Sequence, residues 1–111
     1  MNIQIWGTSK SFDCKKAERW FKERGIRYQY IDIKRYGTSA GEFYSVLNFV
    51  GFESMLDDKK DTSILRYLPD DSARAEKFFN NQDWIRLPVV RNGKQAAVGY
   101  EPTVWETWIK G

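Results

Sequence analysis

The chain has 111 residues, a net charge of +3 and no histidine, and this length suits one domain with a single hydrophobic core. The absence of imidazole argues against serine-protease-like, papain-like and zinc-dependent chemistry. Lys and Arg alternate with Asp and Glu along most of the sequence, so the basic excess predicts a solvated surface and no direct nucleic-acid binding. No basic-then-apolar leader follows Met1, and no apolar run approaches the roughly 20 residues that span a bilayer. We therefore expect a cytoplasmic protein with no membrane association and no metal centre.

The N-terminal third predicts a β-α-β unit. Residues 2–6 alternate between polar and apolar side chains, which predicts a strand. Residues 13–24 favour a helix that has Cys14, the only cysteine, on its apolar face. Residues 27–33 alternate again and are rich in β-formers, so we expect a second strand that is parallel to the first and joined by a right-handed crossover.

The middle of the chain predicts a helical insertion, at about residues 38–82. Ser39 and Glu42 have the spacing of a capping box, and apolar residues follow at helical intervals, which predicts a helix of about ten residues. Residues 51–60 are expected to be an irregular connection. Two further short helices are expected after them.

The C-terminal part predicts a β-hairpin and a last helix. Residues 87–91 are expected to form a strand, Asn92-Gly93 a tight turn and residues 94–99 the return strand. The last helix begins at Glu101-Pro102. Its predicted apolar face consists of Val104, Trp105, Trp108 and Ile109. The complete order is β-α-β, helical insertion, β-β-α, which predicts an α/β thioredoxin-like fold with a four-stranded mixed sheet in one domain, residues 1–111.

Four parts of the chain resemble the arsenate-reductase-like and Spx-like branch of thioredoxin-fold proteins. They are Cys14-Lys15-Lys16-Ala17, the helical middle, Leu87-Pro88-Val89-Val90 and Val98-Gly99-Tyr100. The resemblance covers nearly the whole chain and depends on the order and spacing of these parts. It implies a glutaredoxin-like redox loop at the start of the first helix and a cis-proline, Pro88, close to that loop.

The candidate catalytic residues are Cys14 and Ser11. The resemblance places the family's nucleophilic cysteine at position 11, which is serine here, and matches Cys14 to the resolving cysteine of Spx-like members. A helix N-terminus favours a thiolate, but a hydroxyl gains far too little acidity there, so we expect Ser11 to be a helix-capping hydroxyl or a polar loop residue. Cys14 is then the candidate nucleophile of a thiol-dependent oxidoreductase or thiol-transfer protein. The alternative is a buried, inert thiol.

The expected substrate groove surrounds this loop. Its predicted residues are Lys10, Phe12, Lys15, Leu87 and Pro88. The resemblance implies arginines around an oxyanion, one of them just before the cis-proline, where this chain has Leu87. Arg86 is one place earlier, and in an extended segment it would point to the opposite side. We expect Arg86, Arg66 and Arg91 to be surface or salt-bridging residues, and arsenate not to be the substrate.

Glutathione or a protein thiol or disulfide is the expected partner, with glutathione as a co-substrate and no resident cofactor. Two alternatives remain open. A non-catalytic member would keep the groove as a peptide- or partner-binding module. An Spx-like transcriptional regulator would bind RNA polymerase, although one cysteine cannot provide a disulfide switch within one chain.

Overall fold

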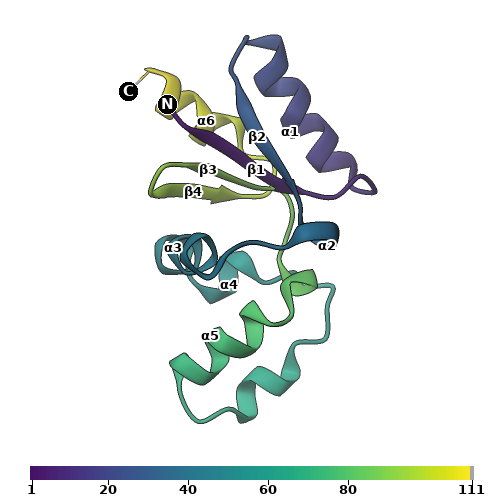
Figure 1. Cartoon of the computed structure of the whole chain (residues 1–111), viewed down its shortest axis with the longest axis vertical. Helices are drawn as coiled ribbons and strands as arrows, with labels where there is room; N and C mark the ends of the chain where they lie inside the picture. Colours follow the sequence, from purple (N-terminus) through teal and green to yellow (C-terminus); the bar gives the residue numbers. More distant parts are fainter. Residues whose placement is uncertain (111) are drawn as a thin grey trace.

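The computed structural model describes residues 1–110, and its centre is a four-stranded mixed sheet in the order β2-β1-β3-β4 (Figure 1). β1 (Ile3–Gly7) is parallel to β2 (Tyr28–Asp32) and antiparallel to β3 (Val89–Asn92). β3 is in turn antiparallel to β4 (Gln95–Val98). The predicted α/β order and mixed sheet are confirmed, while Gly111, the end of the predicted domain, lies outside the described residues.

The helices also follow the predicted order, with α1 (Phe12–Glu23) between β1 and β2 and α6 (Pro102–Lys110) at the end. The helical insertion consists of α2 (Ile33–Tyr36), α3 (Ala40–Val50), α4 (Phe52–Met55), η1 (Ser63–Tyr67), α5 (Asp71–Phe79) and η2 (Gln82–Trp84), where η denotes a 3₁₀ helix. The short helices α2, α4 and η2 were not predicted, because a single turn is too short to show a helical period. None of the helices in residues 1–110 is long and apolar enough to cross a membrane.

The sheet separates two hydrophobic clusters, since successive side chains of a strand point to opposite faces. Ile3 and Ile5 of β1 pack with α1 and α6, including Phe21 and Trp105, whose rings are 5.1 Å apart. Trp6 of the same strand belongs to the cluster that includes α3 and the rest of the insertion. Figure 1 shows α1 and α6 on one side of the sheet and the helices α3 to α5 on the other. The insertion is therefore a separate layer that meets the sheet at one face.

Two predictions in the C-terminal part were wrong in detail. Of the predicted apolar face of α6, Trp105 is fully buried, whereas Val104 and Ile109 are exposed. The helix packs along one narrow stripe, and the large indole of Trp105 occupies the space between it, α1 and the sheet. The hairpin turn begins at Gly93, which has a φ of 60°, because Asn92 still belongs to β3.

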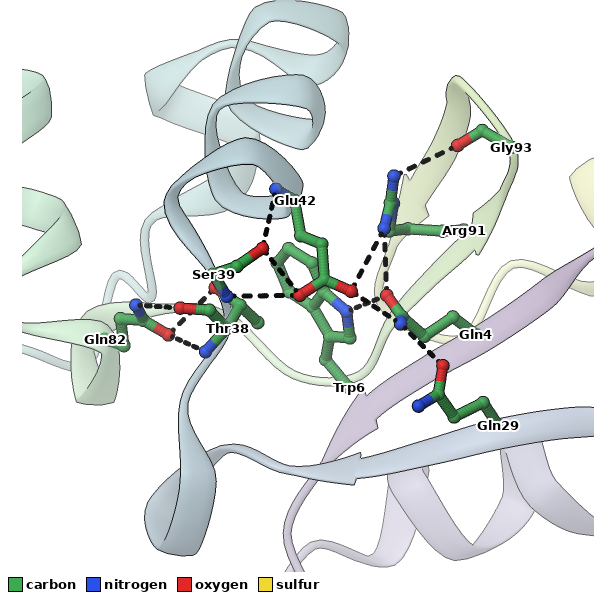
Figure 2. Close-up of polar contacts among 9 residues, drawn as sticks. All are labelled: Gln4, Trp6, Gln29, Thr38, Ser39, Glu42, Gln82, Arg91 and Gly93. Atoms are coloured by element: carbon green, nitrogen blue, oxygen red, sulfur yellow. Dashed lines mark hydrogen bonds and ion pairs between the residues drawn. The ribbon is translucent and has the colours of Figure 1, made fainter.

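The predicted capping box is confirmed, and it also attaches α3 to the sheet (Figure 2). The Ser39 hydroxyl accepts the Glu42 N–H at 3.2 Å, and the Glu42 carboxylate accepts the Ser39 N–H at 3.1 Å. The same carboxylate accepts a hydrogen bond from Gln4 of β1 at 2.8 Å and forms an ion pair with Arg91 of β3 at 3.7 Å. The hydrogen bond from Gln4 is the largest cause of a lowered pKa for Glu42. Arg91, one of the three arginines expected to be surface or salt-bridging residues, thus forms a salt bridge.

Candidate functional site

A cleft of about 570 Å³ lies between the loop that leads into α1 and the helical insertion. Its lining comes from four places: the β1–α1 loop, α2, the segment after α4, and the segment from η2 to the start of β3. Three of the predicted site residues, Lys10, Ser11 and Leu87, line it. The loop before α1 and the segment before β3, which are far apart in the sequence, are therefore brought to one site.

The other predicted groove residues lie outside this lining. Phe12 is 73% exposed, and the Lys16 ammonium group lies 5.8 Å from the centre of its ring. Lys15 is exposed on α1, and the side chain of Pro88 is fully buried. The Leu87–Pro88 peptide bond is cis, as the resemblance implied. Sequence proximity to the loop was thus too coarse to define the groove, because the helix turns successive side chains to different sides.

Ser11 is the N-cap of α1, as predicted. Its hydroxyl accepts the backbone N–H of Cys14 at 3.3 Å, and its backbone is extended, with φ −92° and ψ 124°. The helix therefore begins in the manner typical of serine caps. The same side chain borders the cleft, so the group at the family's nucleophile position is a capping hydroxyl, and the chain has no histidine that could act as its base.

The Cys14 thiol is fully buried behind this cap. It lies against Gly7 of β1, where an added Cβ would be 3.0 Å from Cys14 Sγ and 2.9 Å from the Tyr30 hydroxyl oxygen. Burial is the largest influence and raises the pKa of the thiol, although hydrogen bonds to the Ser11 side chain and the Thr8 backbone lower it by less. A thiol that is both protonated and inaccessible is a poor nucleophile.

Arg86 lines the cleft, which corrects the expectation that it points to the opposite side. Its backbone N–H donates to the Met55 carbonyl at 2.8 Å, and the preceding residue, Ile85, forms a β-bridge with Leu56. This pairing with the insertion, and not simple alternation from β3, orients the segment. The guanidinium group lies over Gly99, where an added Cβ would be 3.3 Å from Arg86 Nη2. Arg86 is exposed and forms no ion pair within residues 1–110.

Within residues 1–110, the backbone N–H and C=O of Leu87, beside the cleft, form no hydrogen bond. The neighbouring groups are paired, since Arg86 N–H donates to Met55 and the Pro88 carbonyl accepts the Gly99 N–H at 2.7 Å. No hydrogen bond in the described part of the chain uses the N–H or C=O of Leu87. Such groups require a partner, either water or another extended chain.

The charges around the cleft are of both signs. Cationic side chains include Lys10, Lys34 and Arg86, and the carboxylates include Asp57 and Asp83. Within residues 1–110 no cluster of three or more His, Cys, Asp or Glu side chains could hold a metal ion. The lining therefore provides hydrogen bonds and charges for a polar ligand.

No family model matches the sequence, and a search of curated proteins finds no match. Solved structures do match. An arsenate reductase (ArsC) related protein from Brucella melitensis is 25% identical, with 100% of this chain and 97% of that chain covered and a TM-score of 0.64. An arsenate reductase from Vibrio cholerae is 21% identical over 96% and 97% of the two chains, with a TM-score of 0.76.

The chain has the thioredoxin-like fold of arsenate-reductase-related proteins. The glutaredoxin-like NrdH-redoxin from Escherichia coli also matches, at 18% identity over 96% and 93% of the chains and a TM-score of 0.52. In this arsenate-reductase-like fold the cleft is next to the cis-proline and the loop before α1, where the resemblance placed the site. Arg86 is among the lining residues that sequence reasoning missed, because its orientation depends on contacts with residues far away in the chain.

Proposed function

We propose that this protein is a binding member of the arsenate-reductase-like thioredoxin fold that works without a redox thiol. Its ligand is a short, extended peptide with a free C-terminal carboxylate, and glutathione is the smallest candidate. The observation that supports this function best is the position of the two candidate catalytic residues relative to the cleft. Ser11 borders the cleft, while the only thiol, Cys14, is fully buried and has a raised pKa.

Three groups supply the contacts for such a ligand. The unpaired N–H and C=O of Leu87 can form backbone hydrogen bonds with an extended peptide, as an open strand edge does. The Arg86 guanidinium can hold the ligand carboxylate in a charge-assisted pair. The Ser11 hydroxyl, already an acceptor for the Cys14 N–H, can donate its own hydrogen to the ligand.

A thiol-transfer role through Cys14 would require that the thiol reach the cleft. The first turn of α1 would have to open, which would break the Ser11 cap and expose a residue that is now completely buried. The thiol would also have to lose its proton against the effect of burial. RNA polymerase binding remains a prediction from the resemblance, and no specific feature of the described residues favours it.

The decisive test measures binding and thiol reactivity on the same protein. S-methylglutathione, which cannot form a disulfide, should shift the backbone NMR signals of Ser11 and Leu87. Cys14→Ala should leave this binding unchanged. Arg86→Ala should weaken it about tenfold or more, since a hydrogen bond to a charged group contributes roughly 1.5–3 kcal/mol. Arg66→Ala is the matched control, because Arg66 is exposed and outside the cleft lining.

The alkylation rate of Cys14 provides the second measurement. We expect the native thiol to react at least about a thousandfold more slowly than the denatured one, because reaction requires opening of a structure that is stable by several kcal/mol. Catalytic turnover of a glutathione mixed disulfide that Cys14→Ala abolishes would establish the oxidoreductase function instead. Absence of S-methylglutathione binding would reject the proposed binding function.

A further inference from the structure

Gln82 connects the cleft lining to a distant part of the chain. It is the first residue of η2, and its side chain bonds to Thr38, 44 positions earlier. Gln82 Oε1 accepts the backbone N–H of Thr38 at 2.8 Å and its hydroxyl at 3.1 Å, and Gln82 Nε2 donates to the Thr38 carbonyl at 3.3 Å (Figure 2). One side-chain amide thus satisfies both backbone groups of a buried residue.

The preceding glycine makes this approach possible. Gly37 has a φ of 65°, and an added Cβ would lie 3.3 Å from Gln82 Oε1. A side chain at this position would therefore be strained by its backbone and crowded by the amide. The linker between α2 and α3 is shaped to receive Gln82.

This contact is the outer end of a polar chain that reaches the sheet. Figure 2 shows the chain from Gln82 to Thr38, then through Ser39 and Glu42 to Gln4 of β1. The first residues of the β1–α1 loop follow the same strand, and that loop contains Ser11. The segment that begins at η2 and the loop before α1, which line the cleft together, are therefore held relative to each other partly through the Gln82 amide.

We propose that Gln82 is a positioning residue for the ligand-binding cleft and that it acts through Arg86. The hydrogen bonds to Thr38 hold the start of the 82–87 segment, and the bond from Arg86 N–H to the Met55 carbonyl holds its end. Without the first attachment the segment can shift, and Arg86 no longer meets the ligand carboxylate. This inference depends on the proposed binding function.

The test compares two probes, S-methylglutathione and the same compound with its glycine carboxylate converted to an amide. Wild-type protein should prefer the free acid about tenfold, because only the acid pairs with Arg86. Gln82→Met keeps the length of the side chain and removes the hydrogen bonds. It should lose most of this preference and retain most of its affinity for the amide. Gln95→Met is the matched control, since Gln95 is exposed on β4 and outside the cleft.

A double-mutant cycle separates positioning from a general loss of structure. Adding Gln82→Met to Arg86→Ala should cost no further affinity, because the residue through which Gln82 acts is already absent. Equal weakening of both probes by Gln82→Met, or an unchanged preference for the acid, would overturn the positioning role. If Gln82→Met does not fold, Gln82→Asn, an uncharged amide whose shorter side chain does not reach Thr38, must show the same reduced preference. Failure of the wild-type protein to bind either probe would reject the proposed function itself, which is a distinct outcome.

Discussion

Replacing Gly7 with alanine tests how tightly the Cys14 thiol is packed against β1. The new methyl group would lie 2.9 Å from the Tyr30 hydroxyl oxygen, 3.0 Å from Cys14 Sγ and 3.1 Å from Cys14 Cβ, whereas ordinary contacts are 3.4–4 Å. Both neighbours are held by the sheet and α1, so neither can move freely. Overpacking of this kind costs about 1–3 kcal/mol. For a domain of this size we expect the melting temperature to fall by about 4 °C or more for each kcal/mol.

The assay is urea unfolding followed by tryptophan fluorescence, together with thermal scans. Gly41→Ala is the matched control, because no atom of the described residues lies within 4 Å of a Cβ at this position in α3, and it should retain stability or gain up to about 1 kcal/mol. In the Gly7→Ala background, Cys14→Ala should restore part of the loss, with a coupling energy of about 0.5 kcal/mol or more. A Gly7→Ala variant within about 0.5 kcal/mol of wild type would refute the packing of the thiol described above.

Three further predictions concern titration and the capping residue. The fold lowers the pKa of Glu42. The stabilisation by the Glu42 carboxylate is therefore present above its unfolded pKa of about 4.3 and is lost as the pH falls through the lower folded pKa. The difference in unfolding free energy between wild type and Glu42→Gln should thus shrink from neutral pH to about pH 3. The fold raises the pKa of Cys14. The stabilisation by the protonated thiol is therefore present below its unfolded pKa of about 8.5 and is lost as the pH rises. Between about pH 8 and 10, the unfolding free energy from urea titrations should fall less for Cys14→Ala than for wild type. Ser11→Cys places a thiol at the cleft and at the N-terminus of α1, so it should be alkylated much faster than Cys14 and, when oxidised, form a disulfide with Cys14 that mass spectrometry detects. A native Ser11→Cys protein that resists alkylation would contradict the exposure of position 11 to the cleft.

Much of the fold depends on local signals that the sequence already contains. The capping box of Ser39 and Glu42 starts α3, the alternating patterns predicted β1 and β2, and the turn signal at Asn92-Gly93 predicted the hairpin of β3 and β4. The spacing of Cys14 to Ala17 and Phe21 placed it on the apolar face of α1, but the sequence left open whether the thiol is reactive or buried. The start of a helix, the alternation of a strand and the apolar face of a helix each depend on residues only a few positions apart. Capping hydrogen bonds and side-chain periodicity therefore reveal them in the sequence.

The sequence by itself therefore determined the order of elements, the place of Ser11 at the start of α1 and the helix face on which Cys14 lies. Only the tertiary structure decided that Arg86 and Leu87 line the same cleft as Ser11, and that Gln82 bonds to Thr38. The physical reason is the range of the interactions. Arg86 takes its orientation from pairing with the segment after α4, and Gln82 from a residue before α3, so neither contact leaves a periodic or local pattern in the chain.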